Sequence, residues 1–245
     1  MITYSSKIIS DFQKYGFVIL KNLIIKSEMV DIKRLYYQVI DYYKDNPSKK
    51  FHNEIITKDF FWIQKPELVC PDLLNLAIIK NSRTIIASLF TGDEQEIDIS
   101  LRIFYKFPNS NTTIPWHQDE AYKPSGYTYN SCNIWIPLEA VDELSGCLNY
   151  IPGSHKFGIF EHTAKYLEET GLVIEACDIP NEKKFSVPLD LGSAVCHHCR
   201  TLHSSGSNQS NKPRPALVIV GNVSKTISEV QEYRKWQQGY ERYWK

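Results

Sequence analysis

The chain of 245 residues lacks a long apolar run and lacks an excess of charge of either sign. No segment approaches the roughly 18 consecutive apolar residues of a membrane-spanning helix, so we expect no membrane partner. Basic and acidic side chains number 28 each and no basic stripe is present, which disfavours a nucleic-acid partner. The apolar run 16–25 is broken by Lys21 and Asn22 and has no small-residue cleavage site, so we expect no secretory signal.

Cysteine is also sparse, and internal repeats and Gly/Ser linkers are missing. A disulfide scaffold needs a denser set of cysteines in a shorter chain, so we expect reduced thiols and a cytoplasmic protein. We predict one domain over 1–245 and expect a monomer or a homodimer. The six cysteines stand at positions 70, 132, 147, 177, 196 and 199.

The first part of the chain, about 1–95, is predicted to be a mixed region with helices. Ser6–Tyr15 fits a short helix that Gly16 ends, and Phe17–Leu20 is typical of a short buried strand. Two later stretches carry apolar residues at helical spacing. A helix is predicted over 29–43 after a capping pattern that begins at Ser27, and another over 73–90 after Pro71.

From about residue 96 the pattern changes to short runs rich in Ile, Val, Phe and Tyr, separated by Gly, Pro, Asn and Ser. Many short strands in one block are typical of a sandwich or barrel of jelly-roll type. We therefore predict a mainly β fold with flanking helices, a jelly-roll core over about 96–223, and a C-terminal helix over about 226–244. The expected strands lie within 97–107, 129–138, 147–151, 184–187, 193–199 and 216–223.

The first chemical signal is the triplet His117-Gln118-Asp119. On a strand, residues i and i+2 face the same side, so His117 and Asp119 can converge on one metal. His203 follows 86 residues later at the end of an apolar run. Two histidines and one carboxylate form the facial triad of non-haem Fe(II) oxygenases, although zinc accepts the same ligands. We rank the similar triplet 52–54 as a chance match, because it lacks an adjoining strand block and a distal histidine.

A possible anion-binding arginine, Arg214, stands 11 residues after His203. If a turn joins two adjacent antiparallel strands, this spacing brings Arg214 back beside His203. Arginine suits a bidentate grip on a carboxylate, so Arg214 is a candidate to hold the far end of a dicarboxylate that chelates the metal. Ser205 is placed to add a hydroxyl donor.

The segment Cys196-His197-His198-Cys199 invites a zinc interpretation. On a strand, however, Cys196 and Cys199 point to opposite faces. We therefore favour a packed strand, with His197 or His198 near the site.

At this point the chain resembles a known family, the phytanoyl-CoA dioxygenase group of Fe(II)/2-oxoglutarate oxygenases. The order and spacing of four motifs agree with the family over roughly 100–222, and the opening segment Phe12–Leu20 is similar as well. The four motifs are Pro115–Asp119, Asn133–Leu138, Ser145–Lys156, and His203–Asn208 together with Arg214.

The resemblance implies a double-stranded β-helix with iron held by His117, Asp119 and His203. It also implies the cosubstrate 2-oxoglutarate held by Arg214 and Ser205. Further candidates for cosubstrate contact are Trp135, Asn133 on the same strand face, and Lys106.

The implied reaction is the O2-dependent hydroxylation or oxidative dealkylation of a small-molecule metabolite, with release of succinate and CO2. Natural-product biosynthesis is one setting for such chemistry. An acyl-CoA substrate is doubtful, because no basic cluster is present for the coenzyme phosphates. Two alternatives stay open: a cupin-like metal enzyme that does not use 2-oxoglutarate, and a non-catalytic barrel that only binds a ligand.

Overall fold

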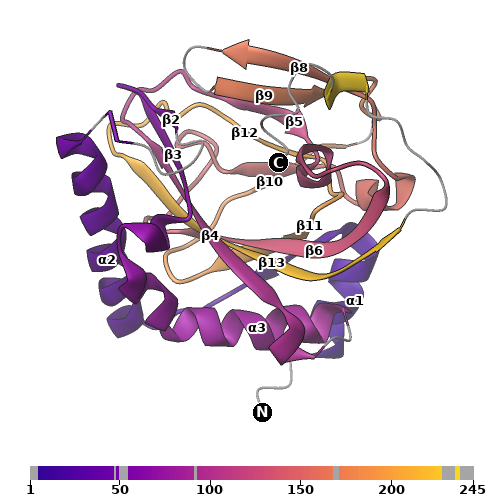
Figure 1. Ribbon diagram of the computed structural model, residues 1–245, viewed down its shortest axis with the longest axis horizontal. Helices are drawn as coiled ribbons and strands as arrows, with labels where there is room; N and C mark the ends of the chain where they lie inside the picture. The colour runs from indigo at the N-terminus through magenta and orange to yellow at the C-terminus, as the bar shows by residue number, and fades with distance from the viewer. Residues whose placement is uncertain are drawn as a thin grey trace.

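The structure is a computed structural model that describes residues 5–46, 48–49, 55–90, 93–167, 171–181, 183–227 and 235–237. Within these ranges, two antiparallel sheets pack against each other, and three α-helices lie along the outer side of the larger sheet (Figure 1). The helices are α1 (Ser6–Tyr15), α2 (Lys26–Asp45) and α3 (Ala77–Phe90). Short 3-10 turns are η1 (Pro66–Leu68), η2 (Pro71–Asn75), η3 (Glu94–Glu96), η4 (Asp119–Tyr122), η5 (Ser154–Phe157) and η6 (Lys235–Gln237).

The strands of the described residues form a larger sheet, a smaller sheet and a separate hairpin. The larger sheet has the order β1 (Phe17–Leu20), β11 (Ala194–His198), β6 (Tyr127–Pro137), β13 (Arg214–Ile227), β4 (Asp98–Lys106), β3 (Phe60–Gln64) and β2 (Ile55–Ile56). The smaller sheet has the order β10 (Phe185–Val187), β7 (Leu148–Tyr150), β12 (His203–Ser205) and β5 (Ile114–His117). The hairpin pairs β8 (His162–Leu167) with β9 (Gly171–Ala176).

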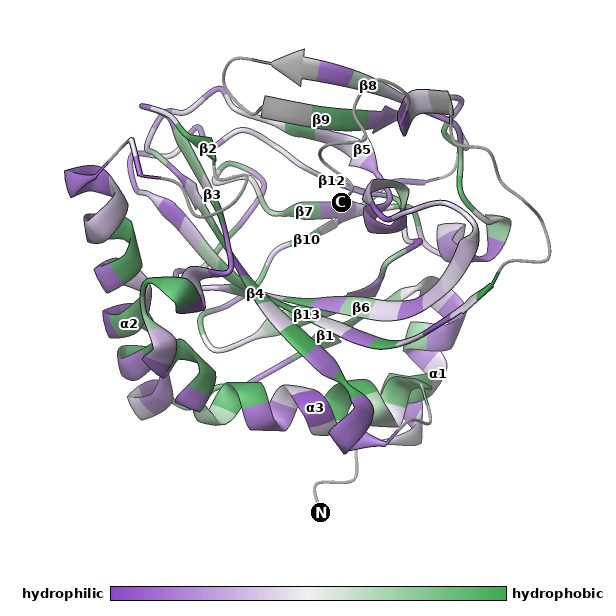
Figure 2. Ribbon diagram, in the orientation of Figure 1, coloured by the Kyte–Doolittle hydropathy of each residue, from purple (hydrophilic) through white to green (hydrophobic). Residues whose placement is uncertain are grey.

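The larger sheet has two faces with different neighbours, because successive side chains of a strand point to opposite sides. On β13, Leu217 and Ile219 pack in the core against the helices. Ala216 and Val218 of the same strand pack in the core between the two sheets. Figure 2 shows apolar and polar segments alternating along α2 and α3, as expected for helices with one covered face.

The mainly β architecture with flanking helices agrees with the sequence prediction, and α1 and β1 have the predicted bounds. The region 1–95 also contains two strands that were not predicted, β2 and β3. Its strand β1 pairs with β11 at one edge of the larger sheet, and its strands β3 and β2 extend the other edge beside β4. The N-terminal region therefore completes the larger sheet as well as covering it.

Two predicted helices differ in detail from the structure. α2 begins at Lys26, and its N-cap residue Ile25 makes no side-chain cap, so the capping pattern predicted at Ser27 is wrong. The stretch predicted as one helix over 73–90 divides into η2 and α3. The division falls at Leu76, whose extended backbone (φ −60°, ψ 138°) cannot continue a helix.

Most of the helix predicted over about 226–244 lies outside the described residues. β13 continues to Ile227, and η6 is the one later segment that the structure describes. In η6, Gln237 donates hydrogen bonds to the carbonyls of Ala121 (3.2 Å) and Lys123 (2.9 Å). None of the helices in the described residues combines the length and apolar character needed to cross a bilayer.

Gly16 joins α1 to β1 at a point where no side chain fits. Its φ of +80° is left-handed, and its N–H caps α1 by donating to the carbonyl of Phe12 at 2.8 Å. Its own carbonyl accepts hydrogen bonds from the N–H of His198 (2.8 Å) and the hydroxyl of Thr201 (2.7 Å). A Cβ at Gly16 would lie 2.5 Å from both the Thr201 hydroxyl and a ring nitrogen of His155.

We expect Gly16→Ala to lower the free energy of unfolding by about 2–4 kcal/mol, since left-handed strain and overpacking add. The matched control is Gly126→Ala. Gly126 also has positive φ (+85°), but nothing lies within 4 Å of its added Cβ. The control should cost about 1 kcal/mol in a urea titration. Equal losses in the two variants would show that the contacts around Gly16 do not matter.

Candidate active site

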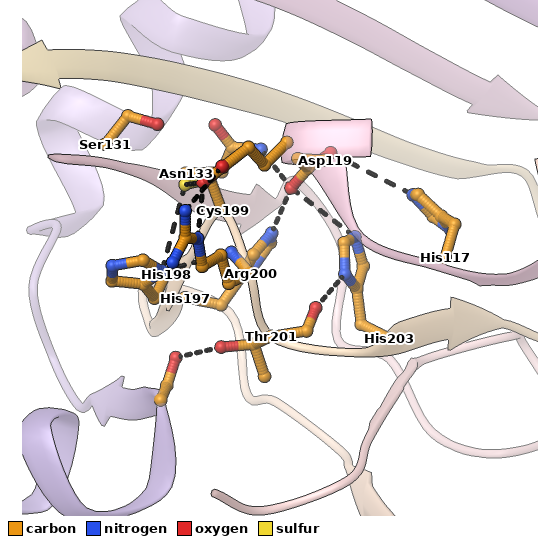
Figure 3. A network of polar contacts seen from close by, with 12 residues as sticks. His117, Asp119, Ser131, Asn133, His197, His198, Cys199, Arg200, Thr201 and His203 are labelled. Carbon is orange, nitrogen blue, oxygen red and sulfur yellow. Dashed lines mark hydrogen bonds and ion pairs between the residues drawn. The ribbon is translucent and has the colours of Figure 1, made fainter. Parts of the chain in front are cut away.

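Three potential metal ligands come together between the two sheets (Figure 3). One ligand atom from each of His117, Asp119 and His203 lies within 4.8 Å of the others. His117 ends β5 and pairs directly with His203 on β12. The sequence prediction that Asp119 lies on the same strand is wrong, because β5 ends at His117 and Asp119 begins the turn η4. The turn still carries the carboxylate toward the two imidazoles.

Backbone carbonyls fix the orientation of both imidazoles. Nδ1 of His117 lies 2.8 Å from the carbonyl of Pro115, and Nδ1 of His203 lies 2.9 Å from the carbonyl of Thr201. A carbonyl only accepts, so each Nδ1 carries the proton and each Nε2 keeps its lone pair. Burial lowers the pKa of each ring to about 4, and for His117 the neighbouring His203 adds to this effect. Both rings are therefore neutral at pH 7, as metal ligation requires.

The Asp119 carboxylate is held on one side and left open on the other. Its Oδ2 accepts hydrogen bonds from Nδ2 of Asn133 at 2.7 Å and Nε2 of His197 at 3.1 Å. Its Oδ1 lies 3.9 Å from Nε2 of His117, too far for a hydrogen bond. Burial alone would raise the pKa of Asp119, but His203, His197 and His117 outweigh it and hold the pKa well below its usual range. Oδ1 is thus the oxygen available to a cation.

Of the two histidines that the sequence analysis placed near the site without a role, His197 is the one that contacts Asp119. Its Nδ1 lies 2.9 Å from the Tyr150 hydroxyl, which donates to it, so its Nε2–H points at Asp119. It pairs across the sheet with Asn133, and the two side chains reach the same carboxylate oxygen. Because alternate residues of a strand share a face, the sequence places His197 on the interior face. Only the pairing of β11 with β6 shows that it lies beside Asn133.

Two cations, Arg214 and Lys106, lie side by side at the far end of the pocket. They are register partners on β13 and β4, with exposed fractions of 2% and 0%. Within the described residues, neither makes an ion pair, and the Arg214 Nε has no hydrogen-bond partner. The Lys106 ammonium donates to the Ser205 hydroxyl at 2.9 Å and the Gly206 carbonyl at 2.5 Å. The guanidinium of Arg214 lies over the Trp135 ring, 5.4 Å from its centroid.

Burial disfavours the charge of both groups. It lowers the pKa of Arg214 to about 10 and, together with the charge of Arg214, holds the pKa of Lys106 well below its usual value. Two adjacent buried cations without a carboxylate are costly unless an anion joins them. This end of the pocket therefore fits a carboxylate that the protein itself does not supply.

One pocket connects the triad with the cation end. Seven of the eight predicted site residues line it, namely His117, Asp119, His203, Arg214, Ser205, Trp135 and Asn133. The eighth, Lys106, reaches it through Ser205. Lining residues that the sequence prediction missed are Arg102, Phe104, Ile114, Leu148, Ser204 and Val218, whereas His197 was expected near the site.

The zinc interpretation of 196–199 finds no support in the geometry. Cys196 packs in the core on the helix side of the larger sheet. The Cys199 thiol donates to the carboxylate of Glu120, at 3.3 Å. In the part of the chain that the structure describes, the triad is the one cluster of potential metal ligands. The competing triplet 52–54 lies outside the described residues.

The profile of the family described as phytanoyl-CoA dioxygenase (PhyH) matches residues 12–216. Over 202 residues the chain is 28% identical to "Probable alpha-ketoglutarate-dependent hypophosphite dioxygenase" of Stutzerimonas stutzeri, covering 77% of this chain and 67% of that one. Over 132 residues it is 32% identical to phytanoyl-CoA dioxygenase of Arabidopsis thaliana, covering 52% of this chain and 45% of the relative. The chain thus spans two thirds of the first relative and less than half of the second.

Solved structures share the whole fold. EvdO2 from Micromonospora carbonacea var. aurantiaca, complexed with 2-oxoglutarate, matches with a TM-score of 0.80 and 26% identity over 96% of this chain and 97% of that one. The carbocyclase SnoK from nogalamycin biosynthesis matches with a TM-score of 0.73 and 20% identity over 98% of this chain and 90% of that one. The predicted jelly-roll fold class is confirmed.

The fold, the His-Asp-His cluster and these similarities define the chain as a non-haem Fe(II)- and 2-oxoglutarate-dependent oxygenase. Within that class, the chain belongs to the phytanoyl-CoA dioxygenase family. The donor set fits the implied groups: two neutral imidazoles and one open carboxylate oxygen suit Fe(II), and the unpaired cations suit a dicarboxylate.

Asn133→Ala is expected to weaken Fe(II) binding by about 10- to 100-fold, because the Asp119 carboxylate loses one of its two hydrogen-bond donors. Anaerobic titration of Fe(II) against a competing chelator measures the change. Asn130→Ala is the control on the same strand: Asn130 is exposed and bonds Ser224. Equal affinities in the two variants would mean that Asn133 does not position the ligand.

Proposed function

We propose that this chain catalyses the Fe(II)- and 2-oxoglutarate-dependent hydroxylation or oxidative dealkylation of a small molecule, releasing succinate and CO2. The observation that carries the proposal is one pocket with two ends: a His-Asp-His cluster and a buried cation pair without a counter-anion. His117, Asp119 and His203 are the proposed iron ligands. When bound, the iron and 2-oxoglutarate supply the oxidising power that protein side chains lack.

The chain's own residues bind and orient the cosubstrate in this proposal. Arg214 offers a bidentate grip on the distal carboxylate, and the Trp135 ring under it limits its movement. Lys106 holds the Ser205 hydroxyl beside the same carboxylate. Because Lys106 occupies that oxygen as a donor, the Ser205 proton is free to point at the ligand.

Apolar side chains also line the pocket. Phe104, Leu148 and Val218 are among its lining residues, and they restrict water beside the reacting groups. Low water content strengthens every charge interaction inside the pocket. Asn133 and His197 keep the Asp119 oxygen in place without occupying Oδ1.

The two alternative functions explain the pocket less well. A cupin-like metal enzyme without 2-oxoglutarate leaves the buried Arg214 and Lys106 without a ligand to compensate them. A barrel that only binds ligand has no need of two neutral imidazoles fixed beside an open carboxylate oxygen. The cation pair therefore favours the 2-oxoglutarate enzyme.

We further infer a small metabolite as substrate, with no nucleic-acid partner, and a monomer or homodimer in the cytoplasm. Balanced charge and the absence of a basic cluster support the first two inferences. Six free cysteines, five of them buried, support a reducing compartment. The missing basic cluster also argues against an acyl-CoA substrate, because the coenzyme phosphates would have no cationic partners.

Arg214→Ala is expected to raise the 2-oxoglutarate concentration needed for half-maximal succinate formation by about 30- to 5,000-fold, since a buried charged pair is truncated. The assay uses anaerobically purified protein given Fe(II), 2-oxoglutarate and O2. His117→Ala should form no succinate at any concentration. Arg34→Ala, on the exposed face of α2, is the control and should behave as the wild type. An unchanged 2-oxoglutarate dependence in Arg214→Ala refutes the assigned grip.

Lys106→Met is expected to stabilise the protein without ligand and to reduce the rise in Tm that 2-oxoglutarate causes. The folded pKa of Lys106 is lowered, mainly by burial, so the charged lysine opposes folding below that pKa. The stability advantage of Lys106→Met should therefore be full below the folded pKa of Lys106 and shrink as the pH rises from that pKa toward the ordinary value of 10.5. A variant that is less stable, yet keeps the full ligand-induced rise in Tm, contradicts the expectation.

A further inference from the structure

The turn η4, which begins with the proposed iron ligand Asp119, is held by donors from the distant turn η6. The indole Nε1–H of Trp236 donates to the carbonyl of Ala121 at 3.3 Å, and the side-chain amide of Gln237 donates to the same carbonyl at 3.2 Å. The amide of Gln237 also donates to the carbonyl of Lys123 at 2.9 Å. The end of the metal-ligand turn is therefore hydrogen-bonded to a segment more than 110 residues further along the chain.

The two carbonyls that η6 reaches stand where a helical turn has no donors of its own. The N–H groups of Ala121 and Lys123 donate within the turn, to the carbonyls of Gln118 (3.0 Å) and Glu120 (2.9 Å). The last carbonyls of a helical turn face no N–H of that turn. Ala121 is fully buried, and a buried carbonyl is costly without a donor. Trp236 and Gln237 therefore supply hydrogen bonds that the turn needs.

A second path leads from η6 to the residue directly before Asp119. η6 lies beside β8 (Figure 1), and the Trp236 ring packs on the ring of His162, with 5.2 Å between centroids. Nδ1 of His162 lies 2.7 Å from the carbonyl of Phe160 and carries the proton, so Nε2 is the acceptor. It accepts the backbone N–H of Gln118 at 3.3 Å. η6 thus reaches the chain on both sides of Asp119.

Among the three proposed ligands, Asp119 is the one whose backbone most needs such support. His117 and His203 are direct register partners on β5 and β12, so strand pairing fixes both. Asp119 stands on a 3-10 turn of four residues, and the hydrogen bonds of such turns are weak. η6 lies beyond residues 12–216, so the motifs shared with the family do not include it.

We propose that Trp236 and Gln237 are positioning residues for the iron site: η6 holds the turn that carries Asp119 and thereby raises the affinity of the triad for Fe(II). The effect is reciprocal, because two events that stabilise the same turn favour each other by the same factor. Iron bound at Asp119 therefore strengthens the hold of η6 on the turn. This inference rests on the proposed iron ligands and adds a segment near the C-terminus to the determinants of metal binding.

The test compares wild type, Gln237→Met, Trp236→Phe, the double variant and the surface control Gln209→Met. Gln237→Met keeps the length of the side chain and loses its donors, and Trp236→Phe keeps an aromatic ring and loses the indole N–H. Gln209 is an exposed glutamine whose amide also donates hydrogen bonds. Anaerobic titration of Fe(II) against a competing chelator gives the affinity. Hydrogen–deuterium exchange of the backbone amides of 235–237 is measured with and without Fe(II).

We expect Gln237→Met to weaken Fe(II) binding by about three- to thirtyfold and the double variant by about ten- to a hundredfold. Gln209→Met should stay within about twofold of wild type. In the wild type, Fe(II) should slow the exchange of 235–237 by a factor similar to the affinity that the double variant loses. In the double variant, Fe(II) should leave this exchange unchanged. A purely structural role of η6 would not make its exchange depend on iron.

Two results overturn the inference: equal Fe(II) affinities in the wild type and the double variant, or wild-type exchange at 235–237 that Fe(II) does not change. The second measurement needs no variant, so it decides the question even where a variant fails to fold. An equal loss of affinity in Gln209→Met also contradicts the inference. Failure of the proposed iron ligands looks different, since the wild type itself would then bind no Fe(II).

Discussion

The alternation of side chains along the long strands is the constraint on which both the core and the site depend. On β4, β6 and β13, one set of alternate residues is apolar and packs under the helices, as Ile103, Ile134 and Ile219 do. The other set faces the smaller sheet and carries the pocket residues. A slip of one residue in β13 would send Arg214 into the helix-covered core and Leu217 into the pocket. The apolar face therefore fixes the register that aligns the site.

Charge inside the pocket is compensated at one end and not at the other. Asp119 has two hydrogen-bond donors and three imidazoles around it, so its carboxylate is stable without a ligand. Arg214 and Lys106 have only Ser205, a backbone carbonyl and an aromatic ring. Natural proteins keep such a destabilising arrangement where binding needs it, because the anion then gains a desolvated double grip. The uneven compensation gives the pocket a direction: the ligand that supplies negative charge enters toward Arg214.

Residues with strong local signals could be predicted from the sequence. Gly16 ends α1 because only glycine suits its left-handed backbone, and the apolar run after it forms β1. The triplet at 117–119 and the spacing to His203 and Arg214 identified both ends of the pocket. Even there the local geometry was partly wrong, since Asp119 lies on a 3-10 turn instead of the strand.

The features that could not be predicted depend on contacts between distant parts of the chain. Nothing near His197 in the sequence shows that β11 lies beside β6. The hydrogen bond between His197 and Asp119 could therefore not be predicted from the sequence. The same is true of Lys106, whose burial follows from its place between β3 and β13. The break at Leu76 is set by tertiary packing that overrides a continuous helical pattern.

The junction of α1 and β1 shows why the N-terminal region belongs to the site, although it supplies no ligand. Gly16 accepts a hydrogen bond from Thr201, and the carbonyl of Thr201 fixes the His203 ring (Figure 3). The next residue, Phe17, stacks on Tyr150 with 4.4 Å between ring centroids, and Tyr150 orients His197 toward Asp119. Gly16 thus supports the ligand His203 through Thr201, and Phe17 supports the ligand Asp119 through Tyr150 and His197. Metal affinity depends on such outer partners as well as on the ligands themselves. A displacement of α1 would therefore reach the metal site through both paths at once, while leaving the cation end at Arg214 in place.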